Sequence, residues 1–157
     1  LRDHGHDPAR LPWFSSPLSR SIETTDRMRA AFEQTLPDIR VDERLREISF
    51  GELEGRLHDE LPASLSIAPG ARNADYWDYR PPAGETYQEV ADRLEDFAAV
   101  LSGPAIVVAH GGVMRVLRNI LEGADRLEAV NWHPPQGAHI RNQSLRFPSH
   151  HGGQRVV

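Results

Sequence analysis

Residues 106–115 read Ile-Val-Val-Ala-His-Gly-Gly-Val-Met-Arg, and this stretch decides the fold. The β-branched run at 106–108 predicts a buried strand, and the apolar spacing that begins at Val113 predicts a helix. His110 lies between the two, at the carboxyl end of the expected strand. In α/β sheets this is where ligands bind and where helix N-termini favour anions. The stretch therefore predicts a phosphate site that contains an imidazole. A hydrogen-bonded core histidine is the alternative.

Composition narrows the classes of protein that fit. The chain has 157 residues, a length that suits one domain over residues 1–157. It has no cysteine, which excludes disulfides and thiolate metal sites. All 18 basic residues are arginine, which excludes lysine chemistry, and the net charge of −5 argues against general nucleic-acid binding. No apolar run approaches the ~20 residues of a membrane span. We expect a cytoplasmic protein without a nucleic-acid or membrane partner.

Apolar and turn residues elsewhere predict alternating strands and helices. In chain order we expect a strand at 11–14, a helix at 17–35, a strand at 39–41, a compact acidic loop at 45–55, an irregular segment at 56–82, a helix at 86–101 and a pair of edge strands at 125–147. A serine at the N-cap and Pro17 in the first turn would start the first helix. The alternation predicts an α/β fold, with three α/β/α layers and a mostly parallel central sheet.

Apolar spacing also predicts which faces of these helices are buried. The expected core positions of the first helix are Ile22, Met28, Ala31 and Phe32. Those of the helix at 86–101 are Tyr87, Val90, Leu94, Phe97 and Val100 or Leu101.

Two further segments carry polar groups suited to phosphate chemistry. Residues 15–20 place two serines and Arg20 at the expected strand-to-helix junction, and a guanidinium binds phosphate through two parallel hydrogen bonds. The alternative is an exposed helix arginine in a surface ion pair. Residues 45–55 place carboxylates between apolar residues, where a raised pKa would suit a general acid. The alternative is a solvated acidic turn.

Four stretches together resemble the histidine phosphatase superfamily, the phosphoglycerate-mutase-like proteins. They are Ser15–Thr24, Leu45–Gly55, Pro82–Tyr87 and Val108–Gly112, which follow one another in this order between residues 15 and 112. The resemblance implies a phosphoglycerate-mutase-like fold. It also implies phosphoryl transfer through a phosphohistidine, with no metal and no cofactor. Arginines and a second histidine then stabilise charge on the phosphoryl oxygens.

The resemblance assigns roles by position. It makes Glu47 the proton donor, His110 the second histidine, Arg20 a phosphate-binding arginine, and Ser16 and the backbone N–H of Gly111 further phosphate contacts. Glu52 and Glu54 are rivals of Glu47. Two roles stay open for Glu85: it lines the mouth of the pocket, or it caps the helix at 86–101.

The Arg-His-Gly motif that supplies the family's nucleophilic histidine does not occur in the sequence. His4 is a poor substitute, because Asp3 replaces the arginine and only ten residues separate His4 from Ser15. A strand and a crossover helix need a dozen or more. We expect the 157 residues to lack the first strand of the family pattern, so that the domain is incomplete at its N-terminus. A fragment completed by another chain and a degenerate, inactive member are the alternatives.

The favoured function is hydrolysis of a small phosphorylated metabolite. The segment between the acidic loop and Gly84 contains only three cations, Arg56, Arg72 and Arg80, which are few for holding a highly anionic bisphosphate. This disfavours a mutase. A non-catalytic phosphate-binding module is a further alternative. A histidine metal site is a poor candidate, because the histidines lack ligand spacing. We expect a small phosphorylated substrate as the partner and leave a homodimer open.

Overall fold

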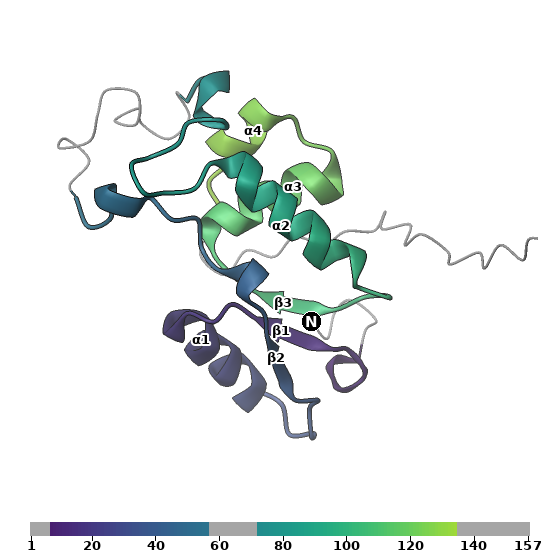
Figure 1. The fold of residues 1–157 in the computed structure, drawn as a ribbon. Helices are drawn as coiled ribbons and strands as arrows, with labels where there is room; N and C mark the ends of the chain where they lie inside the picture. The colour runs from purple at the N-terminus through teal and green to yellow at the C-terminus, as the bar shows by residue number, and fades with distance from the viewer. Residues whose placement is uncertain (1–6, 57–71, 135–157) are drawn as a thin grey trace, which may run out of the picture.

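A computed structural model describes residues 7–56 and 72–134 (Figure 1). The strands are β1 (Trp13–Ser15), β2 (Ile39–Val41) and β3 (Ile106–Val108), and the helices are α1 (Ser19–Ala30), α2 (Tyr87–Ala99), α3 (Gly111–Glu122) and α4 (Arg126–Asn131). The predictions for residues 1–6 and 57–71, and for the part of 125–147 that follows 134, lie outside the described residues.

The three strands form one parallel sheet in the order β2-β1-β3. Trp13 is in register with Ile39 on one side and with Ile106 on the other. Beyond the strands, Ser16 N–H donates to the Val108 carbonyl at 3.0 Å. Because the strands are parallel, their carboxyl ends meet at one edge, which places Ser16 beside the chain that leads into His110. The prediction of a parallel α/β sheet is confirmed.

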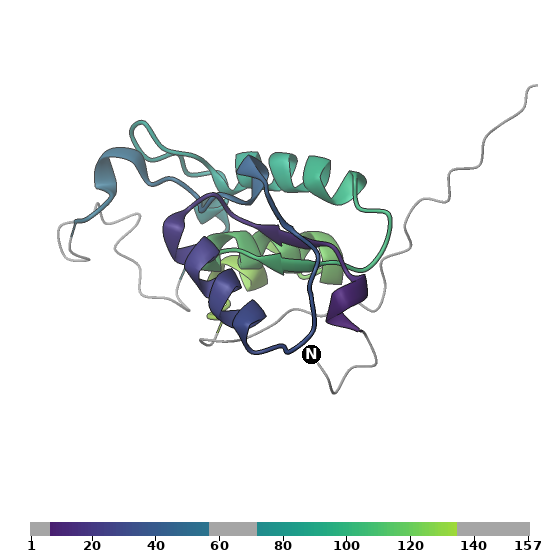
Figure 2. The ribbon, with the colours of Figure 1, turned by 90° about the horizontal axis from the view of Figure 1, so that it is seen from below.

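Alternate side chains of β1 show which helices cover each face. The ring of Phe14 packs edge-on against Phe97 of α2 at 5.2 Å between centroids. The ring of Trp13 points the other way and meets Phe32, which follows α1, at 6.3 Å. α1 therefore covers one face, and α2 with α3 and α4 covers the other, as Figures 1 and 2 show. This is the expected three-layer α/β/α arrangement.

α1 starts and packs differently from the prediction. It begins at Ser19 with Leu18 as its N-cap, so Pro17 lies before the helix and neither Ser15 nor Ser16 is the cap. The Ser16 hydroxyl accepts a hydrogen bond from Leu18 N–H at 3.3 Å, which fixes the chain just ahead of the helix.

The buried face of α1 is polar. Ser21 and Thr25 are buried, whereas the predicted core positions are only partly buried or exposed: Ile22, Met28, Ala31 and Phe32. The Ser21 hydroxyl donates to the Val108 carbonyl at 2.8 Å, and the Thr25 hydroxyl donates to that of Ser15 at 3.2 Å. Hydroxyls can be buried in this way because their hydrogen bonds are satisfied. This hydroxyl cluster joins α1 to β1 and β3.

α2 and α3 follow the predictions more closely. Thr86 and Glu89 form a capping box at the start of α2, and the predicted core face from Tyr87 to Phe97 is buried. Of the two alternatives for its last position, Val100 is 62% exposed, whereas Leu101 is partly buried and packs against the core beyond the end of the helix at Ala99. α3 begins at Gly111 directly after β3, and His110 is its N-cap.

α4 corrects the prediction of an edge strand. Residues 126–131 are helical, and the Asp125 carboxylate caps the helix by accepting Glu128 N–H at 2.8 Å. Ala129 and Val130 are buried in the hydrophobic core that α2 and α3 also form. Among the described residues, no helix has the length and apolar character needed to cross a membrane.

Candidate active site

His110 and Ser16 meet at the carboxyl edge of the sheet. His110 follows β3 and is 7% exposed, and Ser16 follows β1 and is fully buried. A hydrogen bond of 2.6 Å joins His110 Nε2 to Ser16 Oγ across 94 residues of sequence. The pair therefore links the ends of two neighbouring parallel strands, at the position where this class of sheet binds ligands.

The surroundings of His110 keep its ring neutral. Burial, followed by the positive charges of Arg20 and Arg93, lowers the pKa of His110 from 6.5 to about 4. Both effects disfavour the imidazolium form. An anion bound beside the ring would oppose both arginine charges and would raise this pKa.

The lowered pKa makes stability depend on pH. Because the unfolded ring has the higher pKa, it binds the proton first as the pH falls, so protonation favours the unfolded state. We expect the free energy of unfolding of the wild type, relative to that of His110→Asn, to fall by on the order of 2 kcal/mol between pH 6.5 and pH 4. Urea unfolding at several pH values measures this difference. A difference that does not change with pH would contradict the burial of an uncharged ring.

The Glu47 carboxylate lies at the N-terminus of α3. Its Oε1 accepts a hydrogen bond from Gly112 N–H at 3.0 Å and another from Ile48 N–H at 3.1 Å. The amides at the start of a helix have no partner inside the helix and are free to donate such bonds. The first of these bonds holds the Glu47 side chain against Gly112, the second residue after His110.

The two rival carboxylates lie elsewhere. Glu54 Oε1 accepts the Ser49 hydroxyl at 2.9 Å and Phe50 N–H at 3.1 Å, so it supports the acidic loop itself. Glu52 is exposed. Of the carboxylates of Glu47, Glu52 and Glu54, that of Glu47 is the one that hydrogen-bonds to α3 within the part of the chain that the structure describes.

Gly112 is a residue that sequence reasoning missed. A Cβ at this position would lie 2.5 Å from Glu47 Oε1 and 2.6 Å from Ile48 Cγ2. Glycine here leaves room for the side chains of Glu47 and Ile48 against the helix. The only signal in the sequence is that two glycines follow His110. The phosphate role of the first of them, Gly111, stays a prediction.

Arg20 is the second residue of α1 and extends from the same edge of the sheet. It is exposed, and within residues 7–56 and 72–134 its side chain makes no hydrogen bond or ion pair. Its charge nevertheless reaches His110, whose pKa it lowers. The surface ion pair that was its alternative role does not occur among those residues.

Glu85 does not cap α2, because Thr86 does. Its carboxylate accepts Ser49 N–H at 2.9 Å and forms an ion pair with Arg93, whose Nε lies 3.2 Å away. Sequence reasoning did not single out Arg93, since nothing local distinguishes it from other helix arginines. Its importance depends on the tertiary contact.

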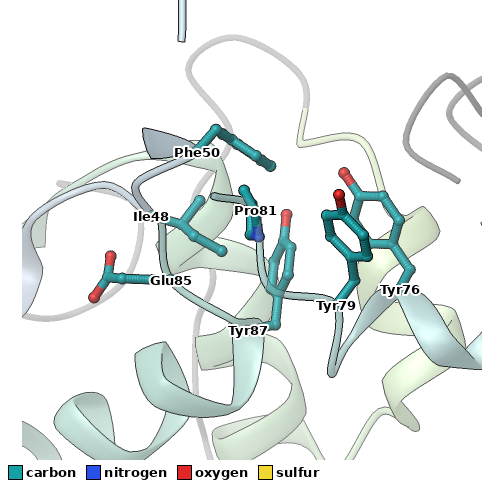
Figure 3. Close-up of a pocket in the computed structure, with 7 residues that line it drawn as sticks. All are labelled: Ile48, Phe50, Tyr76, Tyr79, Pro81, Glu85 and Tyr87. Carbon is teal, nitrogen blue, oxygen red and sulfur yellow. The ribbon is translucent and has the colours of Figure 1, made fainter. Parts of the chain in front are cut away.

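A small hollow adjoins the acidic loop (Figure 3). It encloses about 170 Å³ of empty space, including solvent at its mouth, and is lined by Ile48, Phe50, Tyr76, Tyr79, Pro81, Glu85 and Tyr87. Figure 3 shows the Glu85 carboxylate turned away from the three tyrosines. Burial raises the pKa of Tyr76 and keeps its phenol neutral. In the described ranges, no three or more His, Cys, Asp or Glu side chains group to hold a metal ion.

The fold is that of a parallel α/β protein in which His110, Ser16 and the Glu47 carboxylate meet at the N-terminus of α3. Residues 1–147 match the family model of the histidine phosphatase superfamily, branch 1, and the chain belongs to this family.

Its relatives include named phosphatases. Glucosyl-3-phosphoglycerate phosphatase of Mycolicibacterium vanbaalenii is 35% identical over 132 residues, which cover 75% of this chain and 55% of the relative. A solved structure of the mycobacterial glucosyl-3-phosphoglycerate phosphatase with inorganic phosphate is 29% identical, with a TM-score of 0.61, and the match covers 78% of this chain and 64% of that one.

A protein of Thermus thermophilus with a solved structure is 33% identical, with a TM-score of 0.57 over 72% of this chain and 60% of its own. The chain spans about half the length of the curated relatives it matches, 55% and 56% for the two glucosyl-3-phosphoglycerate phosphatases compared.

Proposed function

We propose that this protein hydrolyses the phosphomonoester of a small metabolite through a phosphohistidine intermediate. The observation that carries the proposal is the Glu47 carboxylate on Gly112 N–H, beside the hydrogen-bonded pair of His110 and Ser16. In this proposal Glu47 is the proton donor and the polar groups beside it bind a phosphate at the helix N-terminus, where an anion is favoured. The relatives that are named phosphatases support the same activity.

In this proposal some of the described residues bind the phosphate and one transfers a proton. Arg20, Ser16 and the N–H of Gly111 hold the phosphoryl oxygens. His110 is neutral in the unliganded site. A bound anion favours its protonated form, and the ring stabilises charge on the phosphoryl oxygens. Glu47 protonates the oxygen of the leaving group. The proposal assigns the attacking histidine to no residue of this sequence, in which the Arg-His-Gly motif does not occur.

The substrate class follows from the relatives and from charge. Two relatives are phosphatases named for glucosyl-3-phosphoglycerate, a phosphorylated sugar derivative. The few cations between the acidic loop and Gly84 favour such a substrate over a bisphosphate held for mutase chemistry. We propose one histidine-phosphatase-like domain over residues 1–157, acting in the cytoplasm.

Hydrolysis is tested with the full-length product of the reading frame that encodes these residues. We expect inorganic phosphate to be released from sugar phosphates and phosphorylated sugar acids. We also expect mass spectrometry of the quenched reaction to find a phosphohistidine. A folded protein that releases no phosphate from any phosphomonoester would overturn the proposal. Phosphate binding without turnover would instead indicate the non-catalytic module.

Arg20→Ala should weaken binding of inorganic phosphate to the chain about tenfold, since a charge-assisted contact to phosphate is lost; tenfold corresponds to about 1.4 kcal/mol. Calorimetric titration with phosphate measures the affinity. Arg27→Ala is the matched control, because Arg27 is an exposed arginine on the same helix that pairs with Glu23. Equal weakening by both variants would mean that only overall charge matters.

A further inference from the structure

The acidic loop and the segment that leads into α2 are hydrogen-bonded to each other in both directions. Glu85 N–H donates to the Ser49 carbonyl at 2.8 Å, and Ser49 N–H donates to Glu85 Oε2 at 2.9 Å. Gly84 also lies against the loop, since a Cβ there would be 2.8 Å from the Ser49 carbonyl oxygen. Ser49 is only two residues from Glu47, so these bonds fix the chain on one side of the candidate acid.

Arg93 fixes the chain on the other side. It lies on α2 with 19% of its side chain exposed, and its Nε and Nη2 face the two oxygens of Glu85 at 3.2 and 3.3 Å. Its Nη1 donates to the Arg44 carbonyl. The Glu85–Arg93 pair therefore contacts the main chain at residues 44 and 49, on either side of Glu47.

We propose that Glu85 and Arg93 are positioning residues that hold the 44–49 segment so that the Glu47 carboxylate stays on Gly112 N–H. The proposal rests on the proposed function for the role of Glu47, but the geometry it describes is independent of turnover. Leu45 and Ile48 are buried and anchor the segment in the core. Apolar burial is non-directional, however, whereas the bonds to residues 44 and 49 set orientation.

The same arginine also acts on the second group of the site. The positive charge of Arg93 contributes to the lowered pKa of His110. Glu85 is the ion-pair partner of that arginine. The pair thus connects the placement of the acid with the electrostatics of the histidine.

The experiment follows Gly112 N–H by ¹H–¹⁵N NMR in the full-length product. In Glu85→Ala we expect exchange of this amide with solvent to be about tenfold faster relative to a core amide of α3, with a shifted Gly112 resonance. Arg93→Lys, which keeps the charge but loses the planar fork, should give a smaller change. Glu89→Ala is the matched control, because it removes an ion pair with Arg80 and part of the cap on the same helix without touching the 44–49 segment. The same Gly112 response in the control, or none in Glu85→Ala, would overturn the proposal.

Turnover by the full-length product gives the second readout. Glu85→Ala should lower kcat about tenfold with little change in KM, since the phosphate-binding groups are untouched, and Glu89→Ala should keep both values. An active wild type whose Glu85→Ala variant retains its kcat would contradict positioning. A wild type without activity would contradict the proposed function only, because the exchange rate and chemical shift of Gly112 N–H still test the positioning role.

Discussion

Replacing Glu47 by glutamine should lower kcat for hydrolysis of alkyl phosphates by about 10²–10⁴-fold in the full-length product, the usual contribution of a positioned general acid. Glutamine is isosteric and its amide oxygen can still accept Gly112 N–H, so the site should keep its shape. What is lost is the proton for the leaving oxygen. Steady-state kinetics on a sugar phosphate measures the change, and phosphate affinity should stay within a few-fold.

Comparing two leaving groups shows whether the loss of proton donation causes the lower kcat of Glu47→Gln. A nitrophenolate leaves without a proton, so the loss with p-nitrophenyl phosphate should be much smaller than the loss with an alkyl phosphate. Glu52→Gln, in the same loop and exposed, is the matched control and should leave both rates unchanged. Equal losses on both substrates would assign Glu47 a structural role.

Gly51→Ala should have the largest effect on stability, lowering the free energy of unfolding by about 3 kcal/mol or more. Gly51 has φ of +55° and packs against the segment before α2. A Cβ there would lie 2.1 Å from the Pro82 carbonyl oxygen and 2.5 Å from the Ala83 carbonyl carbon. Both are main-chain atoms, so the acidic loop and this segment would have to separate. Urea unfolding followed by circular dichroism measures the loss.

Gly55→Ala separates the two causes of that loss. Gly55 has φ of +79° in the same loop, but no atom lies within 4 Å of where its Cβ would be. It should therefore cost only the left-handed backbone penalty of about 1–2 kcal/mol. Equal losses for the two glycines would show that the contact with Pro82 contributes nothing.

The elements that the sequence predicts well are those whose signals are local. The run at 106–108 and the apolar face of the helix expected at 86–101 carry their own patterns, and both elements form as expected, although Thr86 and not Glu85 caps the helix. α1 differs because the partners of Ser21 and Thr25 lie on strands, one of them 87 residues away. A hydrophobicity pattern cannot identify such a polar buried face. The pattern at 125–147 predicts a pair of edge strands, whereas residues 126–131 form a helix with an aspartate cap.

In the candidate site, too, the residues with a signal in the sequence are predicted and those that depend on tertiary contacts are not. Motif order singled out Ser16, Glu47 and His110, and the structure places all three at one edge of the sheet, although their chemical roles stay predictions. Gly112 and Arg93 were missed because their contacts arise only when the loop at 45–55 meets α3 and α2. The spacing of residues along the chain does not determine the distances of those tertiary contacts.

The pairing of β1 with β3 has a consequence for the order of folding events. The central strand contacts a neighbour about ninety residues further along, since Phe14 is in register with Val107. Closing so long a loop is entropically slow, and proteins rich in such non-local contacts fold slowly. The bond between Ser16 and His110 forms only after that closure. We therefore expect bound phosphate to lower the unfolding rate and to leave the folding rate nearly unchanged.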